Sequence, residues 1–123
     1  MFDHVSIGVS DLKRAGRFYD AVLKPLDVTR LSDGDGALGY GETAPGLWIL
    51  PAKRPVKADV ESGLHFCFQA KNRSAVDAFH AAALKAGGQD NGKPGIRKDY
   101  SPNYYAAFVV DPDGYRIEAY CGK

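Results

Sequence analysis

Residues 4–24 read HVSIGVSDLKRAGRFYDAVLK, and residues 65–85 read HFCFQAKNRSAVDAFHAAALK. The two stretches align without a gap at an offset of 61 residues, which places His4 opposite His65. Self-similarity over this length indicates two copies of one structural unit in a single chain. The repeat therefore decides the architecture, and the remaining sequence divides into two related halves.

Each copy begins with the alternating residues of a β-strand and continues with apolar residues at helical spacing. Asp11 in the first copy, and Asn72 or Ser74 in the second, are favourable N-caps at the start of the helical stretch. The β-prone runs that follow are Val28 to Leu31, Ala37 to Tyr40 and Leu47 to Leu50 in the first half, then Tyr104 to Val110 and Tyr115 to Cys121 in the second. Asp111-Pro112-Asp113-Gly114 predicts a hairpin turn between the last two runs.

This order of elements predicts an α+β fold of two tandem βαβββ modules, residues 1–52 and residues 63–123, joined by a linker at residues 53–62. We expect a curved, mixed and largely antiparallel sheet with both helices on its outer face. The opposite face carries the two histidines and is free to form a cavity. Glycines and prolines between Gln89 and Asn103 predict a loop over this cavity.

The charge balance is nearly even, with 16 Lys and Arg against 15 Asp and Glu and a formal net charge of +1. No run of like charge suggests a nucleic acid or a membrane surface as a partner. The chain begins with a strand-like pattern instead of a basic and apolar leader, so we expect a cytoplasmic protein. Cys67 and Cys121 are then expected to stay reduced.

Three side chains that can bind a metal are predicted to lie on the face of the strands opposite the helices. His4 and His65 occupy equivalent positions of the repeat, and Glu118 lies in the last predicted strand between Ile117 and Ala119. A carboxylate on a cavity-facing strand costs free energy if it is dry and unpaired. Two imidazoles and one carboxylate satisfy one face of a divalent ion and leave other positions for water or substrate oxygens. We predict that His4, His65 and Glu118 bind one metal ion.

The motifs that carry these residues are Asp3-His4-Val5-Ser6-Ile7-Gly8-Val9, Gly63-Leu64-His65-Phe66 and Asp111-Pro112-Asp113-Gly114-Tyr115-Arg116-Ile117-Glu118. They resemble the ligand-bearing motifs of the vicinal oxygen chelate superfamily, which includes glyoxalase I, fosfomycin-resistance thiol transferases, extradiol dioxygenases and metal-free bleomycin-binding proteins. The resemblance spans nearly the whole chain. It implies paired βαβββ modules around a curved sheet, and a divalent transition metal (Fe, Mn, Ni or Zn) bound to the three ligands.

One ligand of glyoxalase I is missing from this sequence. That enzyme carries a fourth ligand, a glutamate in the last strand of its first module, which also moves protons. Alignment of Gly46 with Gly114 places Leu50 opposite Glu118, and a two-residue slip places Trp48 there. Neither side chain coordinates a hard cation or acts as a base, so lactoylglutathione lyase activity is not expected.

Further residues are expected around the metal. They lie either on the same strand face as the ligands or near the predicted loop: Cys67, Gln69, Arg97, Tyr100, Asn103, Tyr105, Arg116 and Tyr120. Trp48 is expected to form an apolar wall of the cavity. The alternative is that these residues only hydrate an open sheet or an exposed loop. Of the neighbours Tyr104 and Tyr105, we place Tyr105 in the cavity, because the small residues Ala107 and Val109 share its parity. We expect His80 at the surface of the second helix.

Two functions from different classes fit these features. The first is an enzyme whose metal binds two neighbouring oxygens of a small substrate as a Lewis acid, which includes lyases or isomerases, dioxygenases and thiol transferases. The second is a small-molecule binding or resistance protein that uses the same cavity without turnover. Both are compatible with a homodimer, since relatives often exchange modules so that His4 comes from one subunit and His65 with Glu118 from the other. No general base is assigned.

Overall fold

The computed structural model describes residues 1–123. The elements of the first module are β1 (Val5–Val9), α1 (Leu12–Leu23), the short 3-10 helix η1 (Lys24–Leu26), β2 (Thr29–Ser32), β3 (Leu38–Gly41) and β4 (Leu47–Pro51). The linker contains the 3-10 helix η2 (Val60–Ser62). The elements of the second module are β5 (Phe66–Gln69), α2 (Arg73–Lys85), β6 (Gln89–Ile96), β7 (Tyr105–Val110) and β8 (Arg116–Cys121). Both modules therefore have the predicted βαβββ order.

Each module forms its own four-stranded mixed sheet. The strand order is β1-β4-β3-β2 in the first sheet and β5-β8-β7-β6 in the second. The first strand of each module runs parallel to the last, and the other strand pairs are antiparallel. The predicted α+β fold with two tandem modules is confirmed. Because β1 and β5 are edge strands, each presents a row of backbone groups that no strand partner satisfies.

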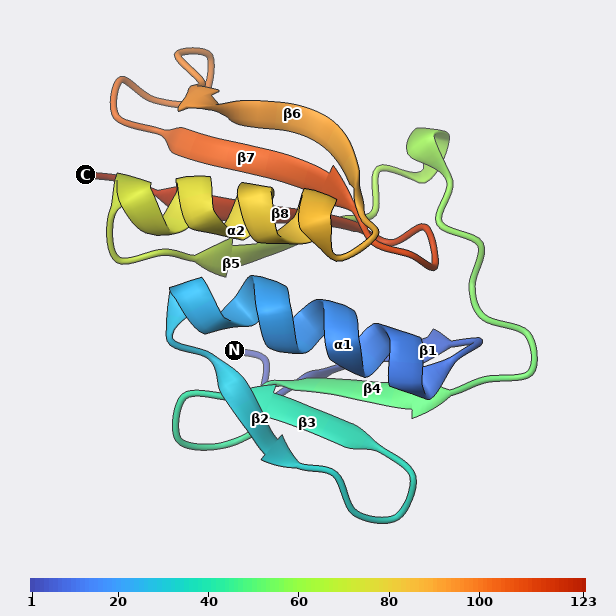
Figure 1. Ribbon diagram of the computed structural model, residues 1–123. Helices are drawn as coiled ribbons and strands as arrows, with labels where there is room; N and C mark the ends of the chain where they lie inside the picture. Colours follow the sequence, from blue (N-terminus) through green and yellow to red (C-terminus); the bar gives the residue numbers. More distant parts are fainter.

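The two helices lie side by side, each in front of the sheet of its own module (Figure 1). The caps are Asp11 for α1, as predicted, and Asn72 for α2, one of its two candidates; their side chains accept hydrogen bonds from backbone N–H groups of the first turn. Phe18 and Phe79, which are equivalent in the repeat, are both fully buried. They belong to one apolar cluster that joins the two modules.

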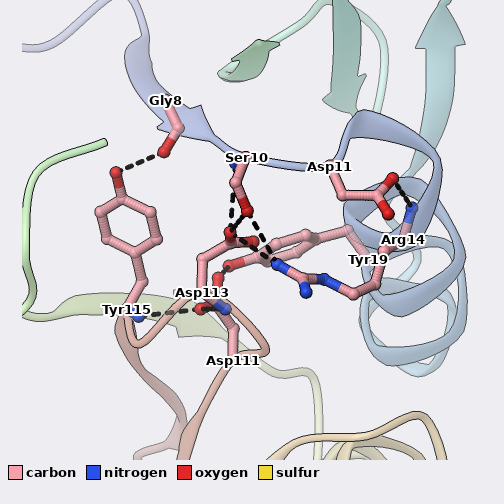
Figure 2. Close-up of polar contacts among 8 residues, drawn as sticks. All are labelled: Gly8, Ser10, Asp11, Arg14, Tyr19, Asp111, Asp113 and Tyr115. Atoms are coloured by element: carbon pink, nitrogen blue, oxygen red, sulfur yellow. Dashed lines mark hydrogen bonds and ion pairs between the residues drawn. The ribbon is translucent and has the colours of Figure 1, made fainter. Parts of the chain in front are cut away.

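The turn between β7 and β8 connects the second module to the start of α1 (Figure 2). Oδ1 of Asp113 accepts hydrogen bonds from the backbone N–H and the hydroxyl of Ser10, at 3.2 and 3.1 Å. It also accepts one from the guanidinium of Arg14 at 2.8 Å. The predicted hairpin turn thus also forms a polar contact between the two modules. We call these contacts, together with those of Asp111 and Tyr115 described next, the module clamp.

Two tyrosines complete the module clamp (Figure 2). Tyr19 on α1 donates to Oδ2 of Asp111 at 2.5 Å, and Tyr115 donates to the carbonyl oxygen of Gly8 at 2.6 Å. The other oxygen of Asp111 accepts the backbone N–H groups of Asp113 and Tyr115. Burial raises the pKa of Asp111, and the hydrogen bond from Tyr19 opposes this rise.

Two predictions about the second module need correction. The predicted loop between Gln89 and Asn103 is a loop only after Ile96, because Gln89–Ile96 forms β6, an edge strand antiparallel to β7. Gly92 has a φ of 151° and lies where the register shifts, so irregular pairing at the sheet edge accommodates residues that argue against a regular strand. His80 is buried instead of exposed, because β6 brings Oδ1 of Asp90 to 2.9 Å from its Nε2.

Cys67 and Cys121 are both free, as the sequence predicts. Cys121 is buried in the apolar cluster, whereas Cys67 is exposed on β5. None of the helices combines the length and the apolar character that a membrane span requires.

Candidate metal centre

His65 and Glu118 meet on the face of the second sheet that points away from α2. His65 directly precedes β5, and Glu118 lies within β8, the parallel neighbour of β5. Nε2 of His65 is 3.1 Å from Oε1 of Glu118. The imidazole side chain is 47% exposed, whereas the glutamate side chain is only 2% exposed. Two of the three predicted ligands are therefore in contact, with an accessible ring beside a buried carboxylate.

The second oxygen of Glu118 has a different partner. Tyr104, the residue before β7, donates its hydroxyl to Oε2 at 2.6 Å. Burial and the neighbouring carboxylate raise the pKa of Tyr104, so the phenol stays protonated and remains a donor. Its ring stacks on that of Tyr120, with centroids 4.1 Å apart.

The chemistry of these contacts fits a divalent metal ion. A buried carboxylate is costly unless charged partners or several hydrogen bonds compensate it, and Glu118 has one imidazole and one phenol. An imidazole nitrogen and a carboxylate oxygen are donors that first-row transition metals accept. A cation bound between His65 and Glu118 would therefore offset the cost of burying this carboxylate.

His4 is separate from this pair within one chain. It directly precedes β1 in the first sheet, its side chain is 46% exposed, and its Nδ1 lies 2.6 Å from Oδ1 of Asp3. No group of three or more His, Cys, Asp or Glu side chains in the chain is arranged to hold a metal ion. One chain thus brings together two of the three predicted ligands.

A cavity of about 230 Å³ opens beside His65. Its lining residues are Gly63, His65, Asn91, Tyr100, Phe108 and Arg116. Tyr100 and Arg116 therefore line the same cavity as His65, one of the predicted ligands. The guanidinium of Arg116 donates to the carbonyl oxygen of Val60 at 3.0 Å, which anchors its positive charge at the cavity.

The prediction for the two neighbouring tyrosines is wrong. Tyr105 lies on the helix side of β7, where its hydroxyl donates to Asp77 of α2 at 2.5 Å. Ala107 and Val109 share that side and are fully buried in the apolar cluster, because small side chains allow α2 to pack closely on β7. Tyr104 therefore faces Glu118 in place of Tyr105.

Cys67 is the strand neighbour of Glu118, and the Arg97 side chain is held by its own strand. Cys67 pairs with Glu118 in the register of β5 and β8. Desolvation and the carboxylate of Glu118 raise the pKa of the Cys67 thiol to about 12, so it stays protonated. The guanidinium of Arg97 donates to the carbonyl oxygens of Lys93 and Gly95, at 2.7 and 2.9 Å.

The remaining predicted pocket residues lie elsewhere. Gln69 and Tyr120 line a different cavity of about 400 Å³ at the C-terminal end of the chain, although Tyr120 keeps a link to Glu118 through Tyr104. Asn103 is exposed in the turn before β7. Trp48 lies in β4 of the first module, where its ring covers Gly39.

Comparisons with known proteins agree with this architecture. The family model described as Glyoxalase/Bleomycin resistance protein/Dioxygenase superfamily matches residues 1–119. The crystal structure of a glyoxalase/bleomycin resistance protein from Albidiferax ferrireducens is 32% identical, with a TM-score of 0.86 over 98% of this chain and 98% of that chain. Comparison with curated proteins gave no match.

Two structures of the fosfomycin resistance protein FosX share the fold at lower identity. FosX from Mesorhizobium loti is 16% identical, with a TM-score of 0.72 over 100% of this chain and 92% of that chain. A FosX mutant from Listeria monocytogenes, complexed with Mn(II) and 1S,2S-dihydroxypropylphosphonic acid, is 14% identical, with a TM-score of 0.73 over 100% of this chain and 90% of that chain. At these identities the likeness shows the fold alone.

Proposed function

Since the chain belongs to the Glyoxalase/Bleomycin resistance protein/Dioxygenase superfamily, we propose that it is a metal-dependent enzyme acting on a small substrate with two neighbouring oxygens. The observation that carries this proposal is the contact between the His65 imidazole and the buried carboxylate of Glu118. A divalent Fe, Mn, Ni or Zn ion bound there supplies a Lewis acid for the substrate oxygens. The reaction belongs to the classes catalysed by lyases or isomerases, dioxygenases and thiol transferases.

The residues beside the pair define what can bind. The adjacent cavity has room for a small molecule, and Arg116 favours one that carries negative charge on its oxygens. Tyr100 offers a phenol to the same cavity. The free thiol of Cys67 beside Glu118 suits the reducing cytoplasm, which is the compartment we propose.

A homodimer is the functional form that we propose, because one chain presents His65 and Glu118 without His4. Within one chain, the module clamp, including the hydrogen bonds of Asp111 and Asp113, holds the two modules in the observed arrangement. We therefore propose that a second copy supplies His4. β1 and β5 are edge strands, so each has a strand partner on one side only.

Elemental analysis of protein purified without a metal-affinity tag tests the metal site. We expect about one Fe, Mn, Ni or Zn ion per chain in the wild type, and loss of the metal in His65→Ala and Glu118→Ala. Glu61→Ala is the matched control, because this exposed glutamate lies in the linker helix η2 and should not affect metal content. Circular dichroism checks that each variant folds. A wild type that takes up no metal after anaerobic reconstitution contradicts the proposal.

The alternative function is a small-molecule binding or resistance protein without turnover. The observation in its favour is that each oxygen of Glu118 already has a protein partner, His65 or Tyr104, so the polar network is complete on its own. A thermal-shift screen of small oxygen-bearing molecules, with and without a chelator, separates the two functions. Stabilisation that persists with the chelator supports the binding protein, whereas stabilisation that requires metal supports the enzyme.

A further inference from the structure

The fold gives the two oxygens of Glu118 different neighbours. Oε1 lies 3.1 Å from Nε2 of His65, and Oε2 accepts the hydroxyl of Tyr104 at 2.6 Å. A hydrogen bond to an ionised oxygen is roughly twice as strong as one between neutral groups. Within one buried carboxylate, one oxygen is therefore engaged by a phenol and the other is left beside the imidazole.

Tyr104 is held in place by contacts that do not involve Glu118. Its ring stacks on Tyr120 at 4.1 Å with an interplanar angle of 28°, and Tyr100 packs edge-on against it at 4.9 Å. Its backbone carbonyl accepts the N–H of Arg97 at 2.7 Å, and its own N–H donates to Ser101 at 3.3 Å. The hydroxyl is thus directed at Oε2 by the packing of the ring and the turn before β7.

We propose that Tyr104 is a positioning residue of the metal centre: by holding Oε2, it makes Glu118 a metal ligand through Oε1 alone. This inference rests on the proposed function, because it requires a metal at His65 and Glu118. A carboxylate that binds through one oxygen occupies one coordination position, whereas a bidentate carboxylate occupies two. The coordination position that a second carboxylate oxygen would occupy then stays open for a substrate oxygen.

A purely structural role for Tyr104 leads to a different expectation. If its hydroxyl only satisfies a buried carboxylate, its removal lowers the stability of the metal-free protein and leaves the coordination of a bound metal unchanged. Metal affinity and the spectrum of the bound metal therefore separate the two roles. Enzyme activity is not needed for this distinction.

Tyr104→Phe removes the hydroxyl and keeps the ring that stacks on Tyr120. Tyr105→Phe is the matched control, because the neighbouring phenol donates to Asp77 on the opposite side of the sheet. We expect Mn(II) binding, measured by electron paramagnetic resonance of the free ion, to weaken about 10- to 100-fold in Tyr104→Phe. The visible bands of the Co(II)-loaded variant should also weaken, since a second carboxylate oxygen raises the coordination number. Tyr105→Phe should match the wild type.

The outcomes of these measurements separate failure of the inference from failure of the proposed function. Equal Mn(II) affinity and equal Co(II) spectra for Tyr104→Phe and the wild type would overturn the inference and leave the metal site intact. A wild type that binds neither ion would overturn the proposed function as well, so the two failures are distinguishable.

Discussion

Asp111 is a buried carboxylate whose only side-chain partner is the hydroxyl of Tyr19. Burial raises its pKa, so it opposes folding more when ionised than when protonated, and the hydrogen bond from Tyr19 reduces this cost. In Tyr19→Phe we expect the free energy of unfolding to fall by about 2 kcal/mol near neutral pH. The pKa of Asp111 should rise further in this variant, so the loss should shrink as the pH falls through that pKa.

Urea denaturation at neutral and acidic pH measures this change. Tyr115→Phe is the matched control, because Tyr115 donates to the carbonyl oxygen of Gly8, which does not titrate there. It should lose about 1 kcal/mol at both pH values. An equal loss at both pH values for Tyr19→Phe would contradict the role given to the ionised carboxylate.

The sides of the sheet on which Tyr104 and Tyr105 lie could be predicted from the register of β7 and β8. The hairpin turn at Asp111-Pro112-Asp113-Gly114 sets the register, which pairs Phe108 with Glu118. Directly paired residues share a face of the sheet, so Tyr104, two alternations before Phe108, belongs with Glu118. The small size of Ala107 and Val109 reflects close packing against α2 and not a cavity.

Among the elements, both helices were predictable, because a capping residue and an apolar stripe mark each one. The strand β6 was not predictable, because Gly92, Pro94 and Gly95 are typical of a loop. An edge strand needs only one partner and tolerates the register shifts seen at Gly92. Tertiary pairing with β7 thus overrides the local preference of the sequence.

Gly92 is the position at which β6 depends on a glycine. Its φ is 151°, and an added Cβ would lie 2.9 Å from Cδ1 of Phe108. We expect Gly92→Ala to cost about 1–3 kcal/mol of unfolding free energy in urea denaturation. Gly95→Ala is the control in the same strand, because the nearest atom to its added Cβ is 3.3 Å away in the Arg97 side chain. If both variants lose equally little, the backbone at Gly92 is not under the constraint described here.

At the level of the whole molecule, the repeat predicts the modules but not how they meet. Ser10 and Asp113 are 103 residues apart in the sequence, and the local sequence around either residue does not predict their hydrogen bond. The same holds for part of the predicted ligand set. His65 and Glu118 converge because β5 and β8 are neighbours within one module, whereas the position of His4 depends on how modules or chains assemble.

Mixing two variants that each lack one predicted ligand tests whether a second copy supplies His4. In a heterodimer of a His4→Ala chain and a Glu118→Ala chain, a shared site contains His4 from one chain and His65 with Glu118 from the other. One of the two sites is then intact, so metal absent from either homodimer should return after the subunits are exchanged. A site within one chain lacks a ligand in both partners and cannot recover. Native mass spectrometry measures heterodimer formation and metal content together, and heterodimers without metal would contradict the shared site.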